Sequence, residues 1–293
     1  EIYDGLADQR KATELYLDAL AVDPEHVEAG ERVAELLWRA ERYTDLVPVL
    51  EMLTRLGPRP KAGAGGESRP SGAEPAQQVE RLTRLAHAAH ALGLDEKVGK
   101  AYARAAEIDE TNLEAQRGRA AWHQKREEHQ EALAALGKVF EHHVEDLPPS
   151  ERVELFYNMG ACELKLGEKQ KAKELIARAL ELDPAHRPSL LASLELGEAK
   201  PESLIDAKKA LLVTATGVDE QAKLLGEIGD IWLEKLGNRD EAVSAWREGL
   251  ELKNDDHKLL HKCLDAYVEE KSWPQALEML ERLIEVEKVQ SVR

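Results

Sequence analysis

The sequence predicts an all-α fold, an α-solenoid of about seven and a half helix-turn-helix units, on three observations. Aromatic residues make up only 4% of the chain, so the core must be built from Ala, Leu, Val and Ile, a composition typical of packed helices. Apolar and small residues recur at intervals of three and four, the period of an amphipathic helix. The same pattern returns several times along the chain in near-constant register, which indicates an internal repeat.

The clearest unit runs from Phe156 to Pro184. Its small and apolar residues lie on both sides of a break at Gly167, which predicts two amphipathic helices joined by a tight turn. The helix ending Leu182-Asp183-Pro184 recurs almost exactly as Val22-Asp23-Pro24, and loosely as Ile108-Asp109-Glu110 and Leu252-Lys253-Asn254. At each of them we expect one helix to stop and an Asp or Asn to cap the next.

Small residues at matching positions of the units predict close packing between the two helices of a pair. On the first helices they are Ala34, Ala86, Ala120, Gly160 and Gly229. On the second helices they are Ala12, Ala132, Ala172, Ala242 and Ala276. We therefore expect Gly160 to lie against Ala172, with no room for a larger side chain.

These residues resemble the tetratricopeptide repeat, whose pattern has an aromatic, Leu-Gly and Tyr, followed later by Ala, Phe, Ala and Pro. The best match comprises Phe156, Met159-Gly160, Ala172, Ile176, Ala179 and Pro184. Glu163 departs from the pattern, because it stands where the repeat has Tyr. The resemblance implies a right-handed α-solenoid in which each helix pair covers the apolar face of its neighbour.

Two interruptions of the register divide the chain. The first lies at residues 59–78, whose Pro, Gly and Ser content is typical of a flexible inserted loop. The second is shorter and lies at residues 142–150. We therefore assign residues 1–58 to repeat units, the first of them partial, and residues 79–293 to further units. One of these, at 187–217, is degenerate because it lacks the Leu-Gly pair.

Repeat arrays usually carry a polar capping element at each end. No such element is evident in the sequence at either end of this array. We therefore expect the ends to pack on something else, or the chain to be a segment of a longer protein.

Composition narrows the classes of function. The chain has 57 acidic and 40 basic residues and a net charge of −17, so it would repel a phosphate backbone and nucleic-acid binding is not expected. The mean hydropathy of −0.50 and the lack of a long apolar run argue against a membrane span. Two cysteines fit a reducing compartment, and the N-terminus does not resemble a signal peptide. Together these features favour a cytoplasmic location.

No motif in the chain carries recognisable chemistry. The glycines of residues 63–66 lack the Lys-Ser/Thr of a phosphate-binding loop. His257 and His261 stand one helical turn apart, a spacing that can hold a metal, but Cys263 falls at a core position of the repeat. Adjacent carboxylates on amphipathic helices point to solvent. We therefore expect no catalytic residue, no metal and no cofactor, and we do not expect an enzyme.

The remaining candidate is the surface. The resemblance implies that the first helices line a concave groove that receives a peptide or partner segment. The residues expected to bind the partner are Trp38, Arg39, His87, His90, Arg117, Lys125, Tyr157, Lys165, Asp230, His261 and Asp265. The Lys/Asn pair with which chaperone adaptors of this family clamp a terminal carboxylate is missing from the corresponding positions. The groove instead has acidic ends and a mixed, aromatic and basic middle.

The sequence thus predicts a non-enzymatic scaffold or adaptor that binds another protein or an extended peptide in this groove. The acidic flanks favour a segment that carries Lys or Arg. Two alternatives stay open: a regulatory or sensor array of a larger effector such as a kinase or protease, and a metal-dependent enzyme that uses the region of His261.

Overall fold

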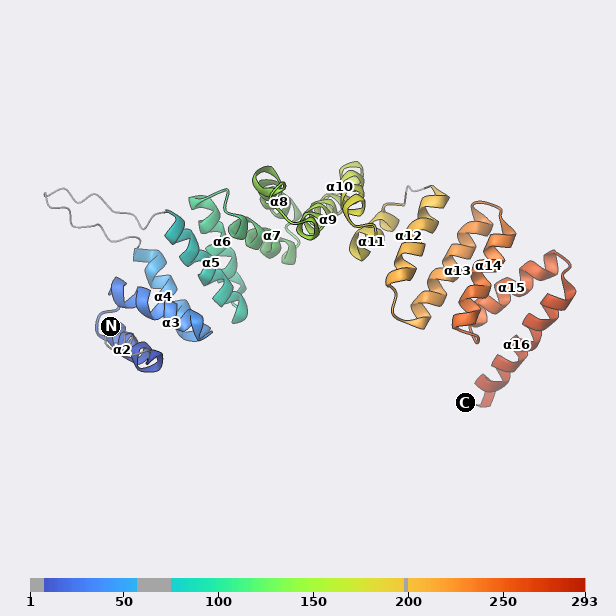
Figure 1. The fold of residues 1–293 in the computed structure, drawn as a ribbon, viewed down its shortest axis with the longest axis horizontal. Helices are drawn as coiled ribbons and strands as arrows, with labels where there is room; N and C mark the ends of the chain where they lie inside the picture. Colours follow the sequence, from blue (N-terminus) through green and yellow to red (C-terminus); the bar gives the residue numbers. More distant parts are fainter. Residues whose placement is uncertain (1–7, 57–74, 198–199, 293) are drawn as a thin grey trace. The chain divides into compact units, whose positions relative to one another are not determined.

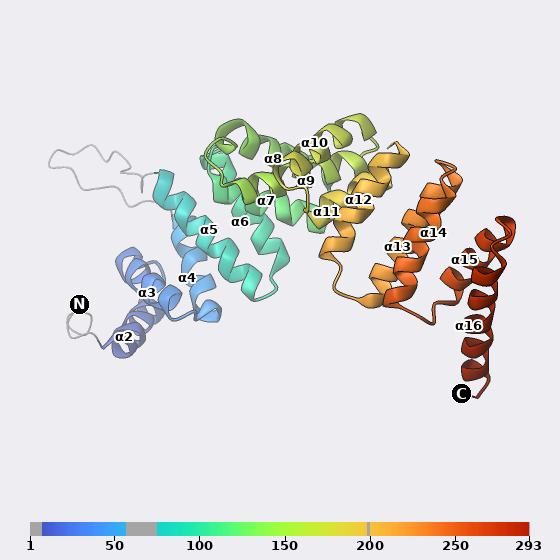
Figure 2. The same ribbon diagram turned by 45° about the vertical axis from the view of Figure 1, so that its right-hand side comes forward.

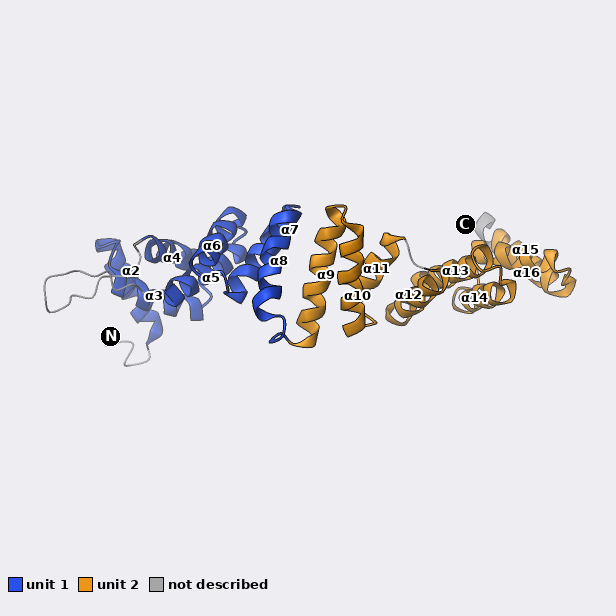
Figure 3. Ribbon diagram, turned by 90° about the horizontal axis from the view of Figure 1, so that it is seen from above, with its two compact units in different colours: residues 1–147 blue, residues 148–293 orange. Residues whose placement is uncertain are grey.

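The structure, a computed structural model, describes residues 8–56, 75–197 and 200–292. These residues belong to two compact units, residues 1–147 and residues 148–293 (Figure 3). Every regular element in the described part of the chain is an α-helix. The all-α fold that the sequence predicts is therefore confirmed.

Unit 1 contains α2 (Gln9–Val22), α3 (Val27–Arg39), α4 (Tyr43–Leu56), α5 (Pro75–Ala91), α6 (Asp95–Ile108), α7 (Leu113–Lys125) and α8 (His129–His143). Unit 2 contains α9 (Pro149–Lys165), α10 (Lys169–Leu182), α11 (Arg187–Leu196), α12 (Pro201–Thr214), α13 (Val218–Glu234), α14 (Arg239–Leu252), α15 (His257–Glu269) and α16 (Trp273–Val292).

The helices follow one another as pairs (Figure 1). In unit 1 the single helix α2 precedes the pairs α3–α4, α5–α6 and α7–α8, and in unit 2 the pairs run from α9–α10 to α15–α16. The helices of a pair contact each other, and the second helix contacts the first helix of the next pair in the same unit. Helices α13 and α14, for example, lie side by side in both views (Figures 1 and 2). This arrangement is the predicted repeat solenoid.

Each turn between the two helices of a pair holds one residue with left-handed backbone. These residues are Glu41, Gly93, Glu127, Gly167, Gly197, Gly237 and Lys271. Glycine is favoured at such a position because it has no Cβ, and at Gly167 the φ angle is 85°. In six of these pairs the left-handed residue lies two positions before the first residue of the second helix, so it gives those units a common register. Gly197 differs, because it directly follows α11 and lies four positions before α12.

The recurring helix endings are confirmed, because helices end at Val22, Ile108, Leu182 and Leu252. The capping roles are only partly as expected. Asn112 and Asp256 do cap the helices that follow them. Asp183 instead accepts a hydrogen bond from the backbone N–H of Ala185 at 2.9 Å. It therefore closes a local turn and does not cap α11.

The small residues that the sequence singles out lie at helix contacts and are buried. A Cβ added to Gly160 would stand 3.3 Å from the backbone oxygen of Ala172 and 2.9 Å from Ile176 Cγ1. The expected contact between Gly160 and Ala172 is therefore confirmed, and it lets the backbones of α9 and α10 approach closely.

Helix α5 begins earlier than the sequence predicts. It starts at Pro75, so residues 75–78 of the expected loop at 59–78 are helical. Proline suits the first helical position because the N–H it lacks would have no partner there. One turn later the buried side chain of Gln78 donates to the backbone oxygen of Thr54 at 2.9 Å, which joins α5 to α4. The rest of the expected loop, up to residue 74, lies outside the described residues.

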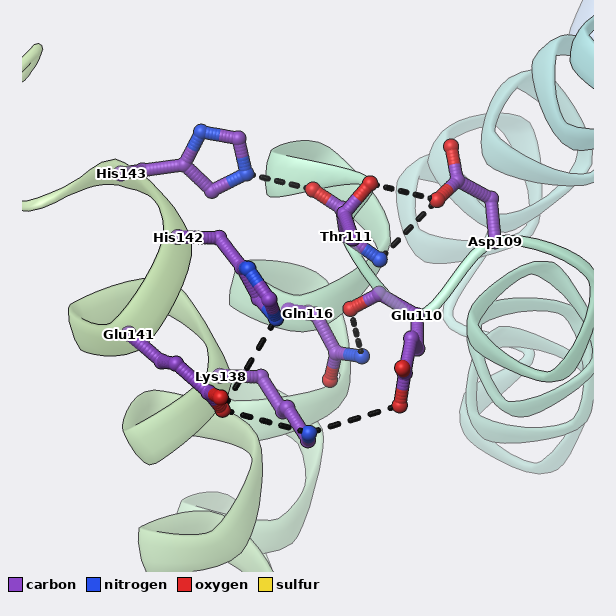
Figure 4. Close-up of polar contacts among 8 residues, drawn as sticks. All are labelled: Asp109, Glu110, Thr111, Gln116, Lys138, Glu141, His142 and His143. Atoms are coloured by element: carbon purple, nitrogen blue, oxygen red, sulfur yellow. Dashed lines mark hydrogen bonds and ion pairs between the residues drawn. The ribbon is translucent and has the colours of Figure 1, made fainter.

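Polar side chains join the loop between α6 and α7 to the end of α8 (Figure 4). Lys138 Nζ lies 3.4 Å from the carboxylate of Glu110 and 3.3 Å from that of Glu141. The Nε2–H of His143 donates to the backbone oxygen of Thr111, since a carbonyl can only accept. These contacts fix the start of α7, the helix that carries part of the candidate site.

Candidate partner-binding surfaces

A hollow of about 240 Å³ lies on unit 1 between α5, α6 and α7. Its lining residues are His87 and His90 of α5, Asp95, Val98 and Tyr102 of α6, and Gly118, Ala121, Trp122 and Lys125 of α7. It therefore brings together three of the residues that the sequence predicts to bind a partner, His87, His90 and Lys125. The structure adds two aromatic side chains, Tyr102 and Trp122, that the sequence prediction did not include.

The rings of Tyr102 and Trp122 each pack directly against a glycine of the neighbouring helix. A Cβ added to Gly99 would stand 2.2 Å from the ring of Trp122, and one added to Gly118 would stand 2.2 Å from the ring of Tyr102. Each helix thus inserts an aromatic ring over a glycine of the other. Trp122 also donates its indole N–H to the backbone oxygen of Asp95 at 2.7 Å. The walls of the hollow are therefore held by packing and by a hydrogen bond.

The charges in the hollow are partly neutralised. Lys125 Nζ lies 2.8 and 2.9 Å from the two carboxylate oxygens of Asp95. The hydrogen bond from Lys125 holds the pKa of Asp95 below its usual value. Burial raises the pKa of the Tyr102 hydroxyl, and the negative charge of Glu114 adds to this shift. At neutral pH the hollow thus offers aromatic surface and two imidazoles beside an internally paired lysine.

Trp38 lies at the edge of the hydrophobic core of unit 1 and is only partly exposed. Its ring makes edge contacts with His87 at 5.2 Å and Tyr43 at 6.2 Å between ring centroids. Arg84 lies over the same ring, 5.4 Å from its centroid. His87 thus connects Trp38 to the hollow, and Trp38 packs against His87, Tyr43 and Arg84.

The remaining predicted residues of unit 1 have different surroundings. Arg39 is exposed and donates to Glu35 at 3.0 Å. Glu35 also accepts from Arg84 at 2.8 Å, and the hydrogen bond from Arg84 is the main cause that lowers the pKa of Glu35. Arg117 is half-buried on α7. Neither Arg39 nor Arg117 lines the hollow of unit 1.

In unit 2 the predicted residues are spread over separate helices. Tyr157 of α9 packs against His186, with ring centroids 5.4 Å apart, and burial raises the pKa of its hydroxyl. Lys165 lies 3.9 Å from Glu195 of α11. His261 of α15 is exposed beside His257, with ring centroids 4.7 Å apart, and Asp265 is exposed one turn further along.

Asp230 belongs to a second, larger hollow of about 650 Å³ between α13 and α15. Both of its carboxylate oxygens accept from Lys262 at 2.6 Å. On the same lining, Lys253 lies 2.7 Å from Asp219. These two ion pairs neutralise part of the charge on the lining, as the pair of Lys125 and Asp95 does in the hollow of unit 1.

The third candidate ligand in the region of His261, Cys263, is set apart by burial. Cys263 is buried in the core, and burial raises the pKa of its thiol to about 11. A thiol this hard to deprotonate is a poor ligand, because a metal binds the thiolate. Within the described ranges no group of three or more His, Cys, Asp or Glu is placed to hold a metal ion.

Among the described residues, no helix has the length and apolar character needed to span a bilayer.

Comparison with known proteins identifies the repeat. Residues 153–186 match the tetratricopeptide repeat family. The chain therefore contains a tetratricopeptide repeat. A solved structure of the C-terminal part of a repeat-containing protein of this family from Cytophaga hutchinsonii has 16% sequence identity and a TM-score of 0.55. That match covers 89% of this chain and 96% of the other, so the two share the fold.

Other solved tetratricopeptide structures are similar at lower scores. One is a chain of the APC/C hetero-tetramer Cut9-Hcn1, with 14% identity, 95% of this chain and 50% of that chain covered, and a TM-score of 0.41. This chain therefore spans about half the length of that one. Another is YrrB, described as having an unusual peptide-binding site, with 17% identity and a TM-score of 0.34. That match covers 73% of this chain and 92% of YrrB. No curated protein sequence matches the chain.

Tetratricopeptide repeats are typically non-enzymatic interaction scaffolds for another protein or peptide. In this tetratricopeptide protein the sequence pattern pointed to His87, His90 and Lys125 but not to Tyr102 and Trp122. One signal was available, since Gly99 and Gly118 lie inside two helices, and a glycine within a helix can mark a close approach. The sequence does not show which ring fills the space above each glycine.

Proposed function

We propose that the chain is a non-enzymatic interaction scaffold that binds an extended segment of another protein on its first helices. The observation that carries this proposal is the α5–α7 hollow, which places His87, His90 and Ala121 of two first helices beside the rings of Tyr102 and Trp122. An apolar pocket with a few polar groups at its rim is typical of a binding hot spot. One apolar side chain of the partner would sit in it.

The charge of the chain favours a basic partner segment. Lys125 and Arg39 are paired with Asp95 and Glu35, so these two cations are largely neutralised. The net charge of −17 then determines the long-range field. A segment that carries Lys or Arg would be steered toward the surface, and the steering would weaken as salt rises.

Site-specific photo-crosslinking tests the proposal. A photoreactive amino acid replaces Ala121, which lines the hollow on α7, and in a matched variant it replaces Ala134, which is exposed on the second helix α8. Both variants are exposed to native lysate, and crosslinked peptides are identified by mass spectrometry. We expect a reproducible, Lys- or Arg-containing segment from the Ala121 position and not from Ala134. Crosslinking confined to Ala134 would overturn the assignment of the surface.

The captured segment, made as a synthetic peptide, is then titrated against the chain. We expect Ala121→Glu to weaken binding by roughly tenfold or more, because a carboxylate would enter the hollow where an apolar side chain sits. The matched Ala134→Glu variant should bind like the parent. Equal affinities of both variants at low salt would contradict a role for the hollow.

A further inference from the structure

Helix α16 has an exposed apolar row on its outer side. The row consists of Trp273, Leu277, Leu280 and Ile284, whose exposed fractions are 60%, 56%, 44% and 44%. Their alternating spacing of four and three places them on one stripe of the helix. On another side of α16, Ala276, Met279 and Leu283 are buried in the core shared with α15. Helix α16 is therefore apolar on two sides, and α15 covers one of them.

The matching positions on α14 and α4 are covered by a first helix. In the register given by the left-handed turn residue, Leu277, Leu280 and Ile284 correspond to three residues of α14 and three of α4. On α14 these are Val243, Trp246 and Leu250, which are buried where α15 packs. On α4 they are Val47, Leu50 and Thr54, which are buried where α5 packs. The outer row of α16 is therefore the surface type to which a first helix docks in this protein.

The first helices that dock in this way also bring positive charge. Arg81 and Arg84 of α5 pair with Glu31 and Glu35 of α3. In unit 2, Lys262 of α15 pairs with Asp230 of α13. Each of these contacts thus combines an apolar row with a cation that reaches the preceding first helix.

Acidic groups that could receive such a cation surround the outer row of α16. Counted back from the left-handed turn residue, Asp265 of α15 matches Glu35 of α3. In unit 1, Glu35 is the carboxylate that pairs with Arg84. Asp265 is exposed. Glu278, Glu281 and Glu285 are also exposed on α16 itself. The charge of this surface therefore complements a basic helix.

We propose that the outer row of α16, together with Asp265, binds an amphipathic helix of a partner protein in the way that α15 packs on α14. The helix would carry apolar residues spaced like Val79, Leu82 and Leu85 of α5, with Lys or Arg at the positions of Arg81 and Arg84. Two copies of the chain meeting through this surface would bring their acidic residues together, which is unfavourable. The same residues would be repelled by an anionic bilayer.

The chain's own α5 sequence supplies a probe with this chemistry. A fluorescently labelled, end-capped peptide of residues 75–91 is titrated with the full chain, and binding is followed by anisotropy. We expect saturable binding that weakens with salt, and an affinity at least roughly tenfold lower for the Leu280→Lys variant. Val213→Lys on α12 is the matched control, because Val213 is 84% exposed and lies away from α16. Both variants replace exposed side chains, and far-UV circular dichroism verifies their fold.

Peptide variants separate the two parts of the interaction. A Leu82→Ser peptide should lose most of its affinity, and an Arg84→Glu peptide should bind more weakly to the parent and be less affected by Asp265→Asn. The proposal is overturned if no saturable binding occurs up to about 1 mM peptide, or if Leu280→Lys binds like the parent. It is also overturned if sedimentation velocity shows a dimer that Leu280→Lys abolishes, since the surface would then belong to a second copy. These results do not depend on crosslinking at α7, so the two proposals fail separately.

Discussion

Replacing Gly229 with Ala should destabilise the protein, although alanine is the better helix former. A Cβ at this position would lie 2.2 Å from Trp246 Nε1, 2.4 Å from Cδ1 and 2.8 Å from Cε2. The ring cannot easily move aside. It is only 2% exposed, it packs with Leu250 and Leu260, and it donates its indole N–H to the backbone oxygen of Gly226 at 3.1 Å.

The size of the effect follows from opposing terms. Overpacking of a filled core costs about 1–3 kcal/mol, and weakening the buried hydrogen bond of Trp246 adds roughly 0.5–1.5 kcal/mol. Replacing glycine within a helix returns up to about 1 kcal/mol. The net loss for Gly229→Ala is therefore about 1–3 kcal/mol. With a urea dependence of about 1–3 kcal/mol per molar, the unfolding midpoint should fall by roughly 1 M.

Gly137→Ala is the matched control, because it makes the same change in the interior of α8. Apart from its chain neighbours and the nearby backbone of its own helix, no atom lies within 4 Å of the Cβ that it would add. Only the gain in helix propensity therefore remains, and the midpoint should rise. Urea unfolding followed by tryptophan fluorescence and circular dichroism measures both shifts, and hydrogen exchange shows whether α13 and α14 lose protection first. A Gly229→Ala midpoint equal to or above that of the parent would refute the reasoning.

Three further results are expected. Because burial raises the pKa of the Cys263 thiol to about 11, its alkylation at pH 8 should be slow in the native chain and fast in urea. Mass spectrometry measures the labelling, and rapid labelling of the native chain would contradict the burial of Cys263. Lys125→Met should raise the pKa of Asp95 toward its ordinary value. Because the ion pair lowers that pKa in the folded state, the pair should stabilise the fold at neutral pH and stop doing so as the pH falls through the lowered pKa. The difference in melting temperature between variant and parent should therefore vanish in acid. Replacing residues 59–74 by a short Gly-Ser linker should leave the circular-dichroism spectrum and melting curve nearly unchanged, because long loops add little to stability; a marked loss of helicity would contradict the loop assignment.

Helix ends and helix pairing could be predicted from the sequence because both depend on local pattern. The endings at Val22, Ile108, Leu182 and Leu252 are each followed by residues that favour a stop. The contact between Gly160 and Ala172 follows from small residues at matching positions. The start of α5 at Pro75 was missed because Pro, Gly and Ser dominate the preceding segment. A proline can end a loop and equally begin a helix, and composition does not distinguish the two.

The candidate site could be predicted only in part, because its aromatic walls arise between neighbouring helix pairs. Periodicity places Tyr102 on the buried side of α6, and it gives no reason to single out Trp122. The two rings line a hollow because Gly99 and Gly118 each leave space for the ring of the other helix. Which side chain fills such a space depends on the crossing of α6 and α7, and the spacing along one helix does not contain that information.

The polarity of the first-helix surface is also decided between helices. The sequence pattern counts Arg39, Lys125 and Lys165 as basic groups of the groove. The structure places each of them near a carboxylate, at 2.9 Å for Arg39, 2.8 Å for Lys125 and 3.9 Å for Lys165. Two of these carboxylates belong to a neighbouring helix, so no count of charges along one helix could reveal them. Each of these pairs also neutralises a carboxylate, so the net charge of −17 is unchanged. This acidic excess of the chain is the physical reason to expect a basic partner segment.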